Sequence, residues 1–378
     1  MQEAFRDYIR QQNLLAAEQK TLLAVSGGRD SVVMAHLFHV SGLAFEIAHC
    51  NFALRDEESM RDEQFVQALA QRLAVRYHVK HFDTRAFATE HKLSIQVAAR
   101  ELRYQWLEEV RQQQQLDYIA TAHHMQDNVE TVLMNLSKGT GIAGLHGIPP
   151  KSGRVIRPLL FATRQQINQY EKEKETGFVE DSSNITDKYT RNYFRHKVIP
   201  KIEEVYPEAI RNIGSSIERL REAEMLYQEA LAVHRKKLLE KRGEEYFIPI
   251  LKLQKTAPLQ TIAYELLKPF GCSAAQAAQV VDMLDSGSGK YLSTQTHRIY
   301  RDRKWLIITP QQVDQSTHFV IAEGQETVLL PGATIYLQAK DATGITPPTA
   351  ATIACLDTKH LKYPLLLRRW KKGITSTR

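Results

Sequence analysis

The stretch KTLLAVSGGRDS, residues 20–31, decides the fold. Its first half, KTLLAV at 20–25, predicts a buried strand, and SGGRDS at 26–31 turns from it into a helix predicted over 30–40. The two glycines let the backbone turn tightly and approach a ligand, and the N–H groups of such a turn and of the following helix N-terminus form an anion site. Ser26 and Ser31 add hydroxyl donors, and Asp30 adds a carboxylate that suits a phosphate-bridging Mg²⁺. The alternative is a plain turn in which Asp30 only caps the helix.

The first half of the chain continues this alternation of strand and helix. Strands are predicted at 43–49, 76–82 and 116–122, and helices at 59–74, 95–114, 126–138 and 164–176. The rhythm predicts an α/β domain whose parallel sheet is covered on both faces. Ligands bind such sheets beyond the carboxyl ends of the strands. The segments after strands 20–25 and 116–122 are therefore the candidate functional loops.

Composition sets the class of protein. The 378 residues carry 50 Lys and Arg against 43 Asp and Glu, a formal charge of +7, and are 43% hydrophobic, which excludes a disordered or fibrous chain. No apolar run reaches the roughly 18 to 20 residues of a membrane helix, and the N-terminus has no secretory signal pattern. The separated cysteines Cys50, Cys272 and Cys355 argue against a disulfide framework or a zinc ribbon. We therefore expect a cytoplasmic protein without a membrane partner.

Further sequence blocks follow the SGGRDS loop in order. They are HCNFALR (49–55) with EES (57–59), ARELRY (99–104), ATAHHMQDNVET (120–131), KGTG (138–141), RPLL (157–160), EDSSN (180–184) and RN (191–192) with Arg195. The loop resembles the signature of the PP-loop ATP pyrophosphatases, which cleave ATP between the α- and β-phosphates. The ordered blocks resemble the bacterial tRNA(Ile)-lysidine synthetase family across 20–200, with a weaker similarity beyond. Phe52 and Ala53 stand where that family usually has His and Gly.

The resemblance implies a Rossmann-like fold of the adenine-nucleotide alpha-hydrolase type and a two-step ligation. The O2 atom of the wobble cytidine in the CAU anticodon of isoleucine tRNA would attack the α-phosphate of ATP, and free L-lysine would then displace AMP at C2. It implies ATP as substrate, Mg²⁺ on Asp30, isoleucine tRNA as partner, and a homodimer. The residues expected to bind ATP are Ser26, Gly27, Gly28, Arg29, Asp30 and Ser31.

Asp127 and Glu130 lie three residues apart just after the fourth predicted strand, so their carboxylates share one helix face at the candidate edge of the sheet. Such a pair suits a lysine ammonium, a Mg²⁺, or the role of base on the attacking amine. The alternative is a first-turn acid pair that complements the helix dipole.

Two groups of cations are candidate phosphate contacts. Arg100 and Arg103 share a helix face, and an arginine beside the phosphates would stabilise charge that develops there; Arg103 is preferred, and a solvated basic face is the alternative. Between 188 and 201 the chain carries five cations, no acid and three aromatic residues, a mixture that suits RNA or ATP. Arg191, Arg195 and Lys197 are the contacts predicted there, against a solvated helix face.

We predict three domains: a PP-loop catalytic domain at 1–210, a helical tRNA-recognition domain at 211–315, and a small α/β tRNA-binding domain at 316–378. The block LLRRWKKG at 366–373 resembles the start of a longer basic segment in the family, so this last domain is expected to be incomplete. Two other functions stay open. One is a different PP-loop enzyme, such as a tRNA thiolase or an amide-forming ligase, although a thiolase needs paired cysteines. The other is an inactive RNA-binding relative.

Overall fold

The computed structural model describes residues 1–54, 56–180, 190–311, 319–330, 333–341, 352–361, 363 and 365–367. Arg55, most of the block at 180–184, the cation Lys188 and residues 368–378 of the expected incomplete tail lie outside them. The chain divides into two compact units, 1–228 and 229–378. The division into three domains therefore stays a prediction.

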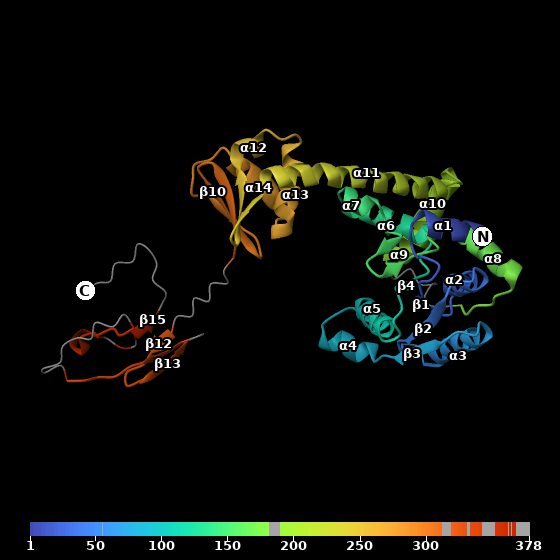
Figure 1. Ribbon diagram of the computed structural model, residues 1–378, viewed down its shortest axis with the longest axis horizontal. Helices are drawn as coiled ribbons and strands as arrows, with labels where there is room; N and C mark the ends of the chain where they lie inside the picture. The colour runs from blue at the N-terminus through green and yellow to red at the C-terminus, as the bar shows by residue number, and fades with distance from the viewer. Residues whose placement is uncertain are drawn as a thin grey trace. The chain divides into compact units, whose positions relative to one another are not determined.

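The first unit alternates strands and helices (Figure 1). In chain order its elements are α1 (Gln2–Gln11), β1 (Thr21–Ala24), α2 (Arg29–Val40), β2 (Phe45–Asn51), α3 (Asp56–Arg72), β3 (Tyr77–His81), α4 (Thr84–Glu90), α5 (Ile95–Gln113), β4 (Tyr118–Ala120), α6 (Met125–Lys138), α7 (Ile142–Leu145), β5 (Lys151–Ser152), β6 (Val155–Ile156), α8 (Arg164–Lys174), α9 (Thr190–Tyr193), the π-helical turn η2 (Phe194–Val198), α10 (Ile199–Val205) and α11 (Ala209–Leu238), within which the boundary between the units falls.

The sheet of this unit has the order β3-β2-β1-β4-β6-β5, parallel except for the β5–β6 pair. Neighbouring residues of β1 face opposite ways: Leu23 packs in a core with α1, α2 and α8, and Leu22 packs in another with Leu107 of α5. Both faces are therefore covered, as the βαβα rhythm predicts. The chain runs from β1 to β2 and β3 on one side and to β4 on the other, so the order reverses between β1 and β4. This reversal places a ligand crevice at the carboxyl ends of those two strands.

The predicted strands and helices of this unit are confirmed to within a few residues. Thr163 and Gln166 also have the sequence spacing of a capping box at the start of α8, and the structure confirms that box. The Thr163 hydroxyl accepts a hydrogen bond from the Gln166 N–H at 3.2 Å, and the Gln166 side chain accepts one from the Thr163 N–H at 2.9 Å.

Ala53 adopts a backbone conformation that favours glycine, the residue that the similar family usually has at this position. Its φ is +48°, in the left-handed region, and its N–H donates to Oδ1 of Asn51 at 3.0 Å. An L-residue in this region costs about 1–2 kcal/mol of folded-state stability. This is more than the stability lost through the greater entropy that glycine gives the unfolded chain. Ala53→Gly should therefore raise the free energy of unfolding by about 0.5 kcal/mol in a denaturant titration. Ala68→Gly, on the exposed face of α3, should lower it by about 1 kcal/mol. Equal losses in both variants would contradict the strain.

The second unit has its own core and an antiparallel sheet. Its elements are β7 (Glu240–Arg242), β8 (Glu245–Pro249), α12 (Ile250–Gln254), α13 (Leu259–Leu267), the 3₁₀ turn η3 (Lys268–Phe270), α14 (Ala274–Met283), β9 (Tyr291–Ser293), β10 (His297–Asp302), β11 (Trp305–Pro310), β12 (Phe319–Ile321), β13 (Thr327–Leu330), β14 (Ala333–Tyr336), the 3₁₀ turn η4 (Thr358–His360) and β15 (Leu365–Leu367). Five strands form one sheet in the order β7-β8-β11-β10-β9, and β12–β15 and β13–β14 form two separate pairs.

The description of 211–315 as a helical domain needs correction. The strands that the sequence predicts at 291–292, 297–301 and 304–309 are confirmed as β9, β10 and β11. The charged sequence from 191 to about 242 predicts a helical segment throughout, but β7 occupies its last three residues and β8 follows from Glu245. The run from 240 to 245 is almost all charged, which imitates a solvated helix. Gly243, at φ +62°, makes the turn that folds it into a hairpin. Among the described residues, no helix combines the length and the apolarity needed to cross a bilayer.

Candidate functional site

The SGGRDS loop forms a nest at the carboxyl end of β1. Gly27 has φ +93°, which L-residues rarely adopt, and its carbonyl accepts a hydrogen bond from the Val179 N–H at 2.9 Å. The Ser31 hydroxyl donates to the Gly28 carbonyl at 2.8 Å and accepts from the Ser26 N–H at 3.2 Å. The serines therefore brace the turn from within, and α2 begins at its end with its N-terminus at the sheet edge.

Arg29 turns away from this nest. Its guanidinium donates to Oδ1 of Asn168 at 2.8 Å, lies 4.0 Å from a carboxylate oxygen of Glu171, and stacks on the ring of Phe178 at 4.0 Å. The side chain thus connects α2 to α8 and to the segment that follows α8. Its predicted contact with ATP is therefore limited, in this conformation, to the backbone N–H.

The carboxylates of Asp30 and Asp127 both lie close to the imidazole of His124. The Nε2 atom of His124 lies 3.5 Å from a carboxylate oxygen of Asp30 and 3.6 Å from one of Asp127, and the His124 ring is only 1% exposed. His124 is the N-cap residue of α6, and its N–H donates to the side chain of Asp127, the third residue of the helix, at 3.0 Å. The loop after β1 and the helix after β4 are therefore joined across the crevice by one buried imidazole.

Glu130 is fully buried and is held by arginines. Its two carboxylate oxygens accept hydrogen bonds from Nε and Nη2 of Arg195 at 2.6 and 3.0 Å, and Nη2 also reaches Asp127 at 3.0 Å. Arg191 lies 3.6 Å from Glu130 and donates to the Thr131 hydroxyl at 2.8 Å. The predicted ammonium acceptors are thus occupied by a guanidinium that was itself predicted to contact tRNA or phosphate.

The charges of this cluster support one another. Burial raises the pKa of Asp127, but the nearby His124, His123, the His124 N–H and Arg195 outweigh it and leave the pKa below its ordinary value. Burial lowers the pKa of Arg195, but its hydrogen bonds and charge contact with Glu130 leave it raised. Both groups are therefore ionised at neutral pH.

His123 faces a different, cationic surrounding. Burial and the charges of the nearby arginines lower the pKa of His123 to about 4, while the Asp127 carboxylate acts in the opposite direction. The arginines are Arg157, Arg191 and Arg100. The Nδ1 atom of His123 lies 2.9 Å from the Thr121 hydroxyl. A neutral imidazole at pH 7 serves there as a hydrogen-bonding group.

The two candidate arginines of α5 lie in different places: Arg100 lies near His123, and Arg103 lies beyond the end of β2. Arg100 lies over the ring of Tyr104 at 4.9 Å and is close enough to lower the pKa values of His123 and Arg157. Arg103 lies over the ring of Phe52 at 5.3 Å, beyond the end of β2. The preference for Arg103 as the catalytic arginine stays a prediction, while the contacts bring Arg100 to the cluster around His123. Lys197 is exposed on η2.

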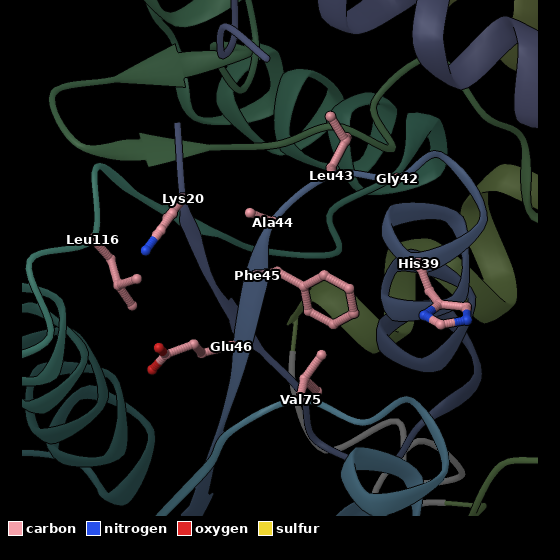
Figure 2. A pocket seen from close by; sticks show the side chains of 9 residues that line it. All are labelled: Lys20, His39, Gly42, Leu43, Ala44, Phe45, Glu46, Val75 and Leu116. Carbon is pink, nitrogen blue, oxygen red and sulfur yellow. The ribbon is translucent and has the colours of Figure 1, made fainter. Parts of the chain in front are cut away.

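Two hollows flank the sheet at opposite ends. One of about 570 Å³ lies beyond the ends of β2 and β3, on the edge that carries the nest, and is lined by Asn51, Ala53, Glu57, Ser59, Met60, Arg61, Gln64 and His81. The other, of about 440 Å³, lies at the amino end of β2; Figure 2 shows Lys20, Leu116 and Glu46 on one side of that strand and Phe45 and His39 on the other. Only the first hollow shares the edge of the candidate site.

Sequence reasoning missed three residues of the site: His124 as the link between two acids, Thr131 as the partner of Arg191, and Arg157. Arg157 is buried, and its Nη1 donates to the Pro149 carbonyl at 2.7 Å. His124 had a signal, since it stands three residues before Asp127. Arg157 stands in the RPLL block at 157–160, which gave no role for it. Thr131 had no signal, because its partner Arg191 comes 60 residues later.

Family models and named relatives match most of this chain. A family model described as a PP-loop domain matches residues 1–202, and a model described as the TilS substrate binding domain matches residues 241–311. A tRNA(Ile)-lysidine synthase of Bacteroides thetaiotaomicron is 36% identical, over 97% of this chain and 83% of the relative. That of Parabacteroides distasonis is 38% identical, over 99% and 84%. Among solved structures, the U34-tRNA thiolase NcsA of Methanococcus maripaludis is 18% identical with a TM-score of 0.48, over 58% of this chain and 79% of the thiolase.

Proposed function

The chain belongs to the tRNA(Ile)-lysidine synthase family, and we propose that the crevice between β1 and β4 carries out that family's reaction. That reaction uses ATP to join lysine to C2 of the wobble cytidine of isoleucine tRNA, through an adenylated cytidine. The observation that carries the proposal is the junction of an anion nest with ionised carboxylates at the reversal point of a parallel sheet. The nest suits phosphates, and the carboxylates suit an ammonium.

The nest and Asp30 would receive the triphosphate. Backbone N–H groups at the start of α2 point to the sheet edge, and the positive end of the helix dipole favours phosphate there. Asp30 is one-third exposed and is the carboxylate next to the nest, so it fits a Mg²⁺ that takes its other ligands from phosphates and water. Bound Mg²⁺ would neutralise charge on the departing pyrophosphate. In this role His124 positions Asp30, since its Nε2 faces the carboxylate.

Lysine would reach Asp127 and Glu130 by exchange with Arg195. Both carboxylates accept a cation in the structure, and the Arg195 side chain is 20% exposed, so it has a route to solvent. A lysine ammonium that replaced it would be oriented by the same oxygens. Asp127 would then take the proton that the ε-amine must lose before it attacks C2. The displaced guanidinium would become available to phosphate, as the sequence predicts for Arg195.

Arg195→Gln tests this exchange. Because the variant lacks the internal competitor, the KM for lysine should fall, by about fivefold or more. Because it also lacks a phosphate contact, kcat should fall at least about tenfold. Steady-state kinetics with varied lysine at saturating ATP and tRNA measures both. A higher KM for lysine would show instead that Arg195 helps to bind it. Arg211→Gln, which removes an exposed arginine of α11, is the matched control.

The function itself is tested by incorporation of labelled lysine into isoleucine tRNA transcripts. Incorporation that requires ATP and the CAU anticodon supports it, and its absence with correctly folded protein contradicts it. Pyrophosphate exchange into ATP, with and without tRNA, separates the alternatives. A ligase acting on a small molecule would exchange without tRNA, and an inactive relative would not exchange at all. The three cysteines are unpaired in the structure, which disfavours a thiolase.

A cytoplasmic location and a homodimer complete the proposal. The reducing cytoplasm fits three free thiols, one of them, Cys355, exposed. The homodimer rests on the family resemblance alone, and its test is the mass of the protein in solution.

A further inference from the structure

An unbroken row of large side chains crosses the outer face of the second unit's sheet. Phe247 of β8 pairs with Ile307 of β11, Ile307 with Tyr300 of β10, and Tyr300 with Tyr291 of β9. These four residues, of which all but Ile307 are aromatic, stand at one level on four neighbouring strands. They are here called the aromatic row. At the usual spacing of about 4.8 Å per strand, the row is roughly 14 Å long.

Arginines lie on both ends of this row. The Arg242 guanidinium lies 4.5 Å from the ring centre of Phe247 and 4.5 Å from that of Trp305, the next outward residue of β11. The Arg298 guanidinium lies 5.0 Å from the ring centre of Tyr291, and hydrogen bonds to the hydroxyls of Ser293 and Tyr300 hold it there. The face therefore presents flat rings and flat cations together.

The row is turned away from the core of its unit. The alternate residues of the same strands, among them Ile248, Ile299 and Leu306, are buried against α12, α13 and α14. Figure 1 shows α13 and α14 together beside the sheet that carries β10. Tyr291 keeps 59% of its surface exposed. Phe247 and Tyr300 are half-buried, and neither contributes to the buried core of the unit.

We propose that the aromatic row is a stacking surface for unpaired nucleotides of the RNA substrate. Nucleobases stack on aromatic rings and on guanidinium planes, and sheets that bind single-stranded RNA present their rings in this way on neighbouring strands. The arginines at both ends supply the charge that phosphates require. The proposal rests on the proposed tRNA-modifying function and adds to it a contact of the second unit with loop nucleotides rather than paired stems.

The test is the affinity of the full chain for an RNA hairpin with an unpaired loop, compared with a blunt duplex of the same stem. Tyr291→Ala should weaken hairpin binding about tenfold and leave duplex binding unchanged, since one stacking partner is lost. Tyr291→Trp should keep the affinity. Tyr336→Ala, which removes an exposed tyrosine from β14, is the matched control and should bind as the unmodified chain does.

Arg298→Lys separates stacking from charge. It keeps the positive charge but loses the flat guanidinium, so hairpin affinity should fall several-fold while the salt dependence of binding stays the same. Unchanged affinity in both Tyr291→Ala and Arg298→Lys would overturn the proposal. So would a change in the oligomeric mass of Tyr291→Ala with RNA affinity intact, because the row would then be a contact between copies. Loss of lysine incorporation in the unmodified chain, with hairpin binding retained, would instead count against the proposed function.

Discussion

Asp30→Asn should reduce tRNA-dependent lysine incorporation at least about a hundredfold, because it removes the carboxylate charge that faces the phosphates and their metal. The fold should survive, since the Asp30 side chain is one-third exposed and asparagine keeps its size. We expect the free energy of unfolding to change by less than about 1 kcal/mol. The measurements are single-turnover incorporation at saturating ATP and a denaturant titration.

Asp7→Asn provides the control for that experiment, because it removes an exposed carboxylate that pairs with Arg10 on α1. Its activity should equal that of the unmodified chain. Turnover by Asp30→Asn within a few-fold of normal would remove Asp30 from the site. Raised Mg²⁺ should restore part of the lost rate if the defect is one of metal affinity.

Glu130→Gln should raise the KM for lysine at least about tenfold and leave the KM for ATP nearly unchanged, because it removes one of the two charges proposed to face the ammonium. It should also lower the free energy of unfolding by about 3 kcal/mol, since Arg195 would lose the partner of a buried ion pair. Kinetics with varied lysine and varied ATP measure the first effect, and urea unfolding measures the second.

A matched comparison is Glu108→Gln on α5, whose carboxylate pairs with Arg111 but is 38% exposed. Its unfolding free energy should fall by less than about 1 kcal/mol, with no kinetic effect. If Glu130→Gln raised both KM values equally, Glu130 would serve the metal or the nucleotide rather than lysine. If it changed stability alone, its role would be only to hold Arg195.

The catalytic unit could be predicted largely from local patterns. The strand before SGGRDS, the glycine turn and the helix after it are signals within twelve residues, and β1 and β4 bring Asp30 and Asp127 to one edge as the parallel topology requires. What could not be predicted depends on contacts distant in sequence. Arg29 pairs with Asn168, and Arg195 pairs with Glu130, 65 residues away. A cation's position in the chain does not tell whether it will meet a phosphate or an acid.

In the second unit, local sequence patterns were a poor guide to the structure. Charged residues around Gly243 favour a helix by composition, but pairing of β7 with β8 decides the outcome. Strand propensity depends on neighbours that the local sequence does not contain. For the same reason the aromatic row was invisible, because its members are scattered over 60 residues and align only through strand register.

The π-helical turn η2 constrains how this region can change in length. Ile199, directly after it, packs with Val129 and Val132 of α6, while Arg195 within it pairs with acids of the same helix. A π turn holds one residue more than an α turn. Deleting a single residue there would rotate Arg191 and Arg195 by about 100° relative to Ile199 and carry both guanidinium groups off Glu130. A substitution in η2 that spares Arg195 would leave this spacing intact, but an insertion or deletion between Arg195 and Ile199 would separate the ion pairs of Arg195 from the apolar contacts of Ile199.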